Sequence, residues 1–291
     1  MTLSFLLVSL CLSTSTWTLD QSWSVHTVSS ARKLNGDELL RIGEIHDVQN
    51  HFPEALTYYE QAVETFRAAK QRRGQATALT RIGSIFERQG RREAAAVRLR
   101  DALSLFSKVP DSPAHPDALL TLGRVSAWLG SREEASHLFE QAVDRYSRSH
   151  NVQGLSAARI QLGLMRISDG QNQEGLRFLQ QAYEDAQSHR DPGQMLIASL
   201  ALGDGRWIMD DLEAAGTQYE QSLAMVKQAR QQLDDKRIAY DKAVEVGGMI
   251  EVPAAALALP MFMRKLDFLS IGTNDLIQYT LAIDRTDDSV A

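Results

Sequence analysis

Small residues recur in this 291-residue chain at a fixed interval of forty, and this period constrains the fold more than any other feature. The first column is glycine: Gly43, Gly83, Gly123, Gly163 and Gly203. A second small column follows twelve residues later: Ala55, Ala95, Ala135, Gly175 and Ala215. A third comes seven residues further on: Ala62, Ala102, Ala142, Ala182 and Ser222. A large side chain separates the last two columns: Tyr59, Leu99, Phe139, Leu179 and Tyr219. The coincidence of these columns predicts five copies of one structural repeat.

Each repeat is predicted to be an antiparallel pair of helices, helix A and helix B. The turn between them is marked by five residue pairs, four of which end in Gly or Asn, the residues that can end a helix in a left-handed conformation: 49–50, 89–90, 129–130, 169–170 and 209–210. Small residues let two helix backbones approach closely, and large apolar residues fill the remaining space. The pattern therefore predicts ten helices between Gly36 and Val226, with the glycines at contacts between helix A and helix B.

This succession of small, alanine, large and alanine residues resembles tetratricopeptide repeats over residues 36–226. The resemblance implies a mainly α fold, a superhelix whose concave face is lined by the A helices and binds a peptide or a partner protein. The repeat is longer than the usual length of about 34 residues. We therefore expect an extended helix B or a longer connection between repeats.

Three arginines are expected on the concave face, Arg41, Arg81 and Arg124, with Trp128 beside them. Guanidinium groups bind carboxylates through paired hydrogen bonds, so one interpretation is a groove for an acidic segment or a chain-terminal carboxylate. The alternative is an ordinary solvated face of mixed charge. Later repeats turn apolar in the same places, which indicates either a hydrophobic groove or a surface that another segment covers: Leu164, Ile167, Leu200, Trp207 and Ile208.

The forty-residue period stops after Val226, and residues 227–291 predict a partial α/β segment. Strands are expected at residues 244–252 and within residues 267–285, with an Ala/Leu/Met-rich helix at 254–264 between them. A strand, a helix and a second strand at this spacing are typical of an α/β barrel, in which polar residues follow the carboxyl ends of the strands.

Two motifs in this segment, GGMIEVP at 247–253 and SIGTNDL at 270–276, resemble those of the phosphoenolpyruvate (PEP)-utilising enzymes, whose fold is a TIM barrel. The likeness is greatest to the nitrogen-related phosphoenolpyruvate–protein phosphotransferases and covers about residues 228–291. It implies that Glu251 and Asp275 bind Mg²⁺, an ion that prefers carboxylate oxygens. It further implies that Asn274, Asp275 and Arg285 contact PEP, with catalysis by positioning and electrostatic stabilisation.

Other parts of that family's machinery have no counterpart in this sequence. The phosphohistidine domain, the arginines of earlier strands and the protonating cysteine of a later strand are missing. We therefore expect an interaction scaffold that carries an incomplete PEP and Mg²⁺ site and transfers no phosphoryl group. The alternative function is a PEP–protein phosphotransferase, here truncated. The sequence leaves open whether the chain is a natural fusion, a truncation or a gene-model artefact.

Composition and the amino terminus limit the partners and the compartment. A net charge of −6 argues against nucleic-acid binding, and the single cysteine, Cys11, excludes an internal disulfide. Residues 1–20 contain the apolar run 5–12, which has the outline of a secretory signal and is too short to span a membrane; residues 21–35 are expected to be a linker. A frayed apolar terminus or a mis-assigned start is the alternative. The chain is expected to be cytoplasmic if the carboxyl-terminal segment is genuine, and secreted or periplasmic if residues 1–20 act as a signal.

Overall fold

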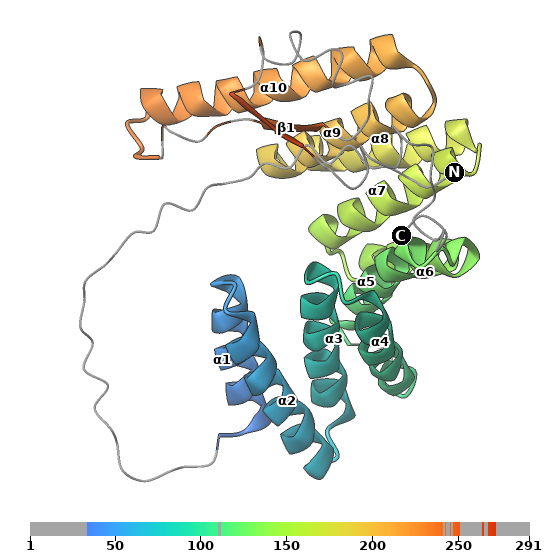
Figure 1. Cartoon of the computed structure of the whole chain (residues 1–291), viewed down its shortest axis with the longest axis vertical. Coiled ribbons are helices and arrows are strands. Elements are labelled where there is room, and N and C mark those ends of the chain that lie inside the picture. Colours follow the sequence, from blue (N-terminus) through green and yellow to red (C-terminus); the bar gives the residue numbers. More distant parts are fainter. Residues whose placement is uncertain are drawn as a thin grey trace. The chain divides into compact units, whose positions relative to one another are not determined.

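The computed structural model describes residues 34–109, 112–240, 242, 245, 247–250, 264 and 267–271. The chain divides after Gly205 into two compact units. The first contains a series of helices, and the second contains a long helix followed by two short strands (Figure 1). The two units are treated separately below.

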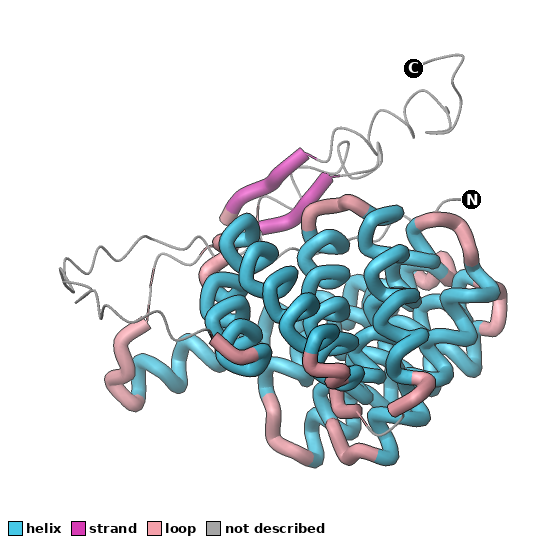
Figure 2. The backbone as a smooth tube through the Cα atoms, turned by 90° about the horizontal axis from the view of Figure 1, so that it is seen from below, coloured by secondary structure: helices cyan, strands magenta, loops and turns pink. Residues whose placement is uncertain are grey.

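The first unit consists of helix pairs joined by short loops (Figure 2). Its helices are α1 (Gly36–Val48), α2 (Phe52–Ala68), α3 (Arg72–Arg88), α4 (Arg92–Phe106), α5 (His115–Trp128), α6 (Arg132–Arg148), α7 (Val152–Ser168), α8 (Asn172–Ser188) and α9 (Pro192–Ile208), whose last three residues fall in the second unit. The odd-numbered helices are the predicted A helices and the even-numbered ones the B helices. A capping box starts the series, because Asn35 and Glu38 each accept a hydrogen bond from the other's backbone N–H.

Four glycines of the column lie at the contacts between helix A and helix B, as predicted: Gly43, Gly83, Gly123 and Gly163. A Cβ atom added to Gly43 would stand 2.5 Å from the ring of Tyr59, and one added to Gly123 would stand 2.5 Å from the ring of Phe139. At Gly163 the same atom would be 2.9 Å from the backbone oxygen of Gly175. Glycine is therefore required for close approach, which is how the small columns specify the packing.

The turns inside the repeats adopt the predicted left-handed conformation. Gly90, Gly130 and Gly170 have φ of +73°, +81° and +80°, and Asn50 has φ of +59°. The sequence pattern missed a second set of left-handed residues, at the connections between repeats: Lys70, His150 and Arg190. These are also spaced by multiples of forty, but their side chains are not ones that mark a turn.

The expected reason for the long repeat is confirmed in part, because helix B is extended but helix A is extended as well. Helices α2, α3, α6, α7, α8 and α9 are each 17 residues long, so helix A is extended as much as helix B. Three residues connect α2 to α3, at positions 69–71, and three connect α3 to α4, at 89–91. The added length of the repeat lies in both helices where the connections are short. Between the second and third repeats it lies in the connection, because eight residues, 107–114, join α4 to α5, which have 15 and 14 residues.

The A helices line one side of the array. In the described residues α1 contacts α3, α3 contacts α5 and α5 contacts α7, whereas consecutive B helices have no comparable contact. The A helices are therefore closer together than the B helices, as on the inner side of a superhelix. The core lies between the A and B helices and includes the small columns. Six alanines of these columns are 0% exposed: Ala55, Ala62, Ala95, Ala102, Ala135 and Ala142.

The second unit contains α10 (Leu212–Asp235) and the strands β1 (Gly247–Ile250) and β2 (Phe268–Ile271). The helix has 24 residues and is followed by a left-handed residue at Arg237, so it runs past the point where earlier repeats turn. The strands pair in parallel, Gly247 with Phe268 and Ile250 with Ile271, inside the two predicted segments. Residues 254–263 of the predicted helix lie outside the described residues. No helix in the described part of the chain is long and apolar enough to cross a membrane.

Candidate functional site

Ion pairs connect consecutive A helices on the side where these helices meet. Arg81 of α3 lies 3.4 Å from a carboxylate oxygen of Glu44 on α1. Arg124 of α5 contacts Glu87 on α3 through two hydrogen bonds, of 2.8 and 3.1 Å. Two of the three expected arginines are therefore already paired with a carboxylate of the preceding repeat, a pairing that the sequence columns did not predict.

The two pairs differ in solvent exposure. The side chains of Arg81 and Glu44 are 38% and 46% exposed, and those of Arg124 and Glu87 are 31% and 19% exposed. An exposed ion pair contributes at most about 1 kcal/mol because water screens it. The paired hydrogen bonds of Arg124 hold it more firmly, so Arg81 is the more available guanidinium.

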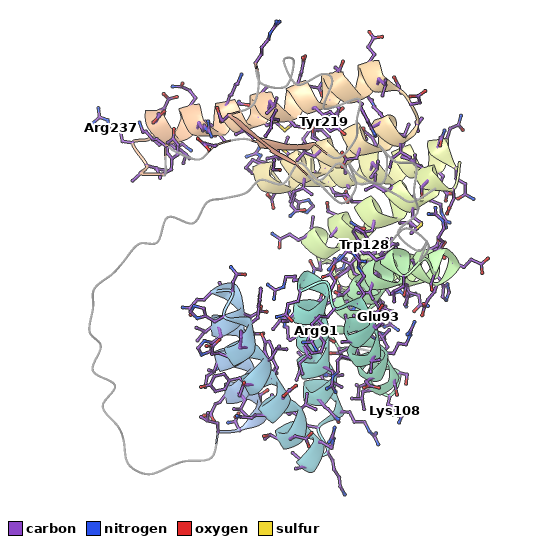
Figure 3. The ribbon with its side chains drawn as sticks, viewed as in Figure 1. Arg91, Glu93, Lys108, Trp128, Tyr219 and Arg237 are labelled. Carbon is purple, nitrogen blue, oxygen red and sulfur yellow. The ribbon has the colours of Figure 1, made fainter. Side chains whose placement is uncertain are left out.

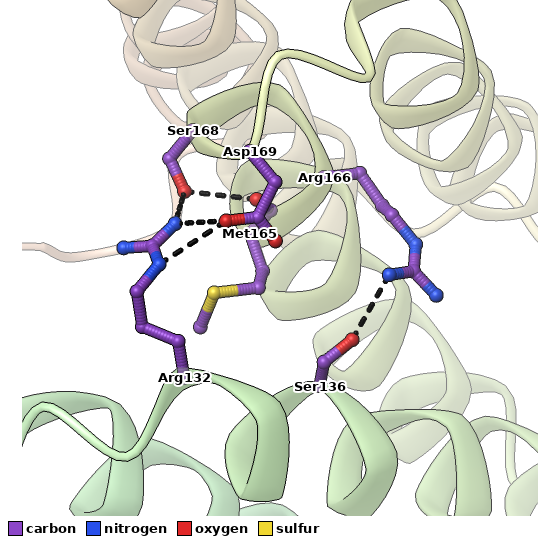
Figure 4. Close-up of polar contacts among 6 residues, drawn as sticks. All are labelled: Arg132, Ser136, Met165, Arg166, Ser168 and Asp169. Carbon is purple, nitrogen blue, oxygen red and sulfur yellow. Dashed lines mark hydrogen bonds and ion pairs between the residues drawn. The ribbon is translucent and has the colours of Figure 1, made fainter.

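A second contact recurs where each B helix begins and meets the end of the next A helix. The guanidinium of Arg88 lies 4.8 Å from the ring centre of Phe52, and that of Arg92 lies 4.5 Å from the ring centre of Trp128. In the third repeat, Arg132 donates hydrogen bonds to Ser168 and Asp169 (Figure 4). The contact recurs at equivalent positions of the repeats, but its chemistry changes. Helix B supplies the aromatic ring and helix A the arginine in the first case, the roles are exchanged in the second, and an arginine of helix B meets a carboxylate in the third.

Arg41 and two apolar neighbours are exposed on α1. Arg41 has no carboxylate within ion-pair distance among residues 34–109 and 112–240. Ile45 is 58% exposed and Val48 is 84% exposed. The residues equivalent to Ile45 in the next repeats are buried: Ile85, Val125 and Met165. Trp128, at the end of α5, is 49% exposed (Figure 3). We call the surface formed by Arg41, Ile45, Val48, Arg81, Arg88, Arg124 and Trp128 the A-helix surface.

Two buried tyrosines differ in how their hydroxyl groups are satisfied. Tyr146 donates a hydrogen bond of 2.5 Å to Asp117, whereas the buried hydroxyl of Tyr59 has no hydrogen-bond partner among the described residues. Burial raises the pKa of both phenols, and Asp117 raises that of Tyr146 further, as Asp47 does for Tyr59. Both hydroxyls therefore stay protonated and can act only as neutral donors or acceptors at physiological pH.

The apolar positions of the later repeats do not form one open surface. Leu164 and Ile167 are 3% exposed, and the Ile167 side chain lies close to Gly175 and Gly205 of its own unit. Leu200 is partly buried; Trp207 and Ile208 belong to the second unit, where Trp207 is 36% exposed. Leu164 and Ile167 are therefore interior residues. The sequence patterns also missed the ion pairs of α7, in which Arg159 contacts Asp185 and Arg166 contacts Glu140.

In the second unit, the parallel pairing of β1 and β2 places the carboxyl ends of both strands at one edge. Glu251 follows Ile250 directly, and Asn274 and Asp275 follow Ile271 closely in sequence. Glu251, Asn274, Asp275 and Arg285 lie outside the described residues. Before β1, Asp234 accepts hydrogen bonds from Lys242 and Tyr240, and the Lys242 ammonium lowers the pKa of Asp234.

Family models match both parts of the chain. Tetratricopeptide repeat models match residues 38–108 and 117–153, and the model of the PEP-utilising enzyme, PEP-binding domain, matches residues 205–291. The chain joins tetratricopeptide repeats to a segment of a PEP-utilising enzyme domain. The PEP-binding model begins inside the fifth predicted repeat, so residues 205–226 carry the repeat columns and also match this domain.

Individual relatives agree with both assignments. A phosphoenolpyruvate–protein phosphotransferase of Cupriavidus necator is 54% identical over 96 residues, which are 33% of this chain and 16% of that protein. The chain thus spans about a sixth of that relative's length. Kinesin light chain TPR-like repeats from Podosopora anserina superpose with a TM-score of 0.56 at 16% identity, over 67% of this chain and 96% of that one. A Rap conjugation gene regulator of plasmid pLS20, solved with the Phr* peptide, gives 0.53 at 17% identity, over 73% and 60%.

Proposed function

We propose that the repeat array is a protein-interaction scaffold that binds an extended acidic peptide along the A-helix surface. The observation that carries this proposal is the combination of exposed apolar side chains and arginines on that surface. Val48 of α1 is 84% exposed and Trp128 of α5 is 49% exposed, and Arg41 and Arg81 lie on α1 and α3. Tryptophan and arginine are the residues that most often dominate the free energy of binding at protein interfaces. The Rap regulator, whose fold is similar, was solved with a peptide.

The available charge favours an acidic ligand. Arg41 has no carboxylate partner in the described ranges, and the exposed pair of Arg81 with Glu44 is weak enough to be exchanged. A peptide carboxylate would accept paired hydrogen bonds from either guanidinium. Arg124 is less available because Glu87 already occupies two of its donors. We therefore expect Arg41 and Arg81 to contribute more to peptide affinity than Arg124.

The test is binding of fluorescein-labelled acidic peptides, selected from a library, followed by fluorescence anisotropy at low and high salt. Arg81→Ala should weaken binding by about fivefold to tenfold, and added salt should weaken binding by the wild-type chain. Arg148→Ala is the matched control, because Arg148 lies on helix B of the third repeat and pairs only with Asp144 in the described structure. Binding that is insensitive to salt and to Arg41→Ala and Arg81→Ala would contradict the proposal and leave an ordinary solvated face.

We also propose that the carboxyl-terminal segment holds Mg²⁺ and PEP, a function favoured by the parallel pairing of β1 and β2. Glu251 and Asp275 are the proposed metal ligands, since carboxylates that follow adjacent parallel strands meet at one edge and supply the oxygen ligands that Mg²⁺ prefers. Asn274 and Arg285 are the proposed contacts of the PEP phosphate. Bound Mg²⁺ would offset the negative charge of the phosphate and carboxylate groups.

Isothermal titration of the full chain with PEP in the presence and absence of Mg²⁺ tests this second proposal. We expect Mg²⁺-dependent binding that Asp275→Asn or Glu251→Gln weakens by at least about tenfold, because each change removes a charged ligand. Glu245→Gln is the control, as Glu245 precedes β1 and is exposed. Equal binding by all variants would contradict the assignment. Release of pyruvate, measured in parallel, would favour the phosphotransferase alternative.

A further inference from the structure

The exposed residues of α1, which stands at the end of the helix series, lie on one face of the helix (Figure 1). They are Asp37, Arg41, Ile45 and Val48, and their spacing of three or four residues places them in a row along the helix. Leu34, which is 38% exposed, stands directly before the helix and three residues from Asp37. We call these five residues the α1 stripe. Within it an apolar residue stands on each side of two opposite charges.

The same face of helix A is buried in the later repeats, because the preceding helix B covers it. Helix α2 packs against α3, α4 against α5 and α6 against α7. A Cβ atom added to Gly74 of α3 would stand 2.5 Å from the Phe66 ring on α2, and Gly154 of α7 likewise lies against the Tyr146 ring on α6. The positions equivalent to Glu38 are alanines that are 0% exposed: Ala78, Ala118, Ala158 and Ala198. This face is therefore an interface in each later repeat that the structure describes.

A further helix B of this kind does not fit the α1 stripe. Where α3 has Gly74 and Ala78, the first repeat has Leu34 and Glu38. Leucine would hold an aromatic ring away from the backbone of α1. The Glu38 carboxylate accepts a capping hydrogen bond from the Asn35 N–H, and a helix packed over it would remove water from a charge. The occupant of the stripe must have a different surface from that of a helix B.

The stripe is complementary to itself. Neither Asp37 nor Arg41 has an ion pair or a side-chain hydrogen bond within the described ranges. The two residues lie one helical turn apart, so in an antiparallel pair of α1 helices each Asp37 faces the Arg41 of the other copy. Leu34 and Ile45 lie five and six residues from the midpoint of the charged pair, on opposite sides. The same arrangement therefore brings each Leu34 close to the Ile45 of the other copy.

We propose that the α1 stripe is a self-association surface on which a second copy of this chain packs its own α1 antiparallel. A two-fold axis relates the copies, so every contact occurs twice: Asp37 with Arg41, and Leu34 with Ile45. The charges fix the direction and register of the pair, and the apolar residues are removed from water. The second copy thus covers the face that a preceding helix B covers in the later repeats.

The association is weak and separate from the proposed peptide binding. One pair of short helices buries less than the roughly 1,200 Å² typical of stable complexes, so the dimer forms only at high protein concentration. Added salt weakens it because the ion pairs lie at the surface. Arg81 and Trp128 take no part in it. Arg41 belongs to both surfaces, and in dilute solution, where the chain is single, it is available to a peptide.

Sedimentation velocity of the full chain, in a concentration series that reaches the millimolar range, tests the inference by exchange of charges. The samples are the wild type, Asp37→Arg, Arg41→Asp and an equal mixture of these two variants. Each variant alone places like charges opposite one another in its own dimer, whereas the mixture restores both opposite-charge pairs. Glu60→Arg is the matched control, because Glu60 is exposed on α2 of the same repeat and lies outside the stripe. Thermal unfolding of each variant checks that it is folded.

Each single variant should dimerise at least about tenfold more weakly than the wild type, because like charges face each other across the contact. The mixture should dimerise to within about threefold of the wild type, and Glu60→Arg should match it. A wild-type chain that stays single at every concentration would overturn the inference and leave the stripe to a different protein. Dimers that persist in both single variants, or a mixture that restores nothing, would overturn it as well. A chain that dimerises in this way but binds no acidic peptide would contradict the proposed function alone.

Discussion

The close contact at Gly123 makes a quantitative prediction about the stability of the repeat array. An alanine Cβ at this position would stand 2.5 and 2.7 Å from two carbons of the Phe139 ring. Phe139 is 1% exposed, so its ring has no open space into which to move. Gly123→Ala must therefore push α5 and α6 apart or force the ring out of its preferred rotamer.

The expected magnitude follows from two opposing effects. Overpacking a filled interior costs about 1–3 kcal/mol, whereas alanine is preferred over glycine inside a helix by about 1 kcal/mol. Because the added Cβ would stand only 2.5 Å from the ring, the overpacking cost lies in the upper part of its range, about 2–3 kcal/mol, and Gly123→Ala should lower the free energy of unfolding by about 1–2 kcal/mol. Gly123→Leu adds three more carbons to the same contact and should cost several kcal/mol, on the order of 3 or more.

Urea unfolding followed by far-UV circular dichroism measures this loss. Gly216→Ala is the control, because Gly216 lies inside α10 and, apart from the local backbone of that helix, no described atom lies within 4 Å of an added Cβ. That change should leave every transition midpoint unchanged or raise it. If Gly123→Ala proved as stable as the wild type, glycine would not be required for the contact between helices A and B, and the explanation of the glycine column would be refuted.

Three further predictions concern buried polar groups. Tyr59→Phe should raise the free energy of unfolding by about 1 kcal/mol because it removes an unpaired hydroxyl. Tyr146→Phe should lower the free energy of unfolding by about 2 kcal/mol because Asp117 loses its hydrogen-bond donor. Urea midpoints of the two variants that shift in the same direction would contradict this pair of predictions. Burial raises the pKa of both phenols in the folded state, so unfolded tyrosines ionise first and stability should fall as the pH rises above about 10. The double phenylalanine variant should show a shallower alkaline loss in the same titration, and an equally steep one would be evidence against the raised values. Glu87→Gln should destabilise the array more than Glu44→Gln, because the exposed ion pair of Glu44 with Arg81 contributes at most about 1 kcal/mol. Equal thermal unfolding midpoints of the two variants would contradict the inference that the less exposed pair of Glu87 with Arg124 contributes more to stability.

The helices and their close contacts could be predicted because small residues are required wherever two helix backbones pack closely, and so appear in the sequence at those positions. Gly43 and Gly123 lie where the period placed them, and the left-handed turns at Gly90 and Gly130 follow from glycine's lack of a Cβ. The left-handed connection at Lys70 could not be predicted in this way. There the surrounding helix packing fixes a conformation that the side chain itself does not favour.

The repeat pattern could not predict which carboxylates pair with the surface arginines. Arg81 and Arg124 occupy different columns of the repeat, yet each reaches a glutamate of the preceding A helix. Such a pair depends on the reach of two long side chains across neighbouring helices and leaves no periodic signature. The one signal that could have identified the unusual site at Tyr59 was a polar residue in a column otherwise occupied by leucine and phenylalanine in the first unit.

Hydrogen–deuterium exchange of the full chain with and without a bound acidic peptide tests the central claim most directly. The scaffold account predicts that the peptide slows exchange in α1, α3 and α5, whose residues form the A-helix surface, and leaves α2, α4 and α6 unchanged. Slower exchange confined to the B helices, or to residues 206–291, would show that the peptide binds elsewhere and would contradict the claim that the A helices form the binding surface.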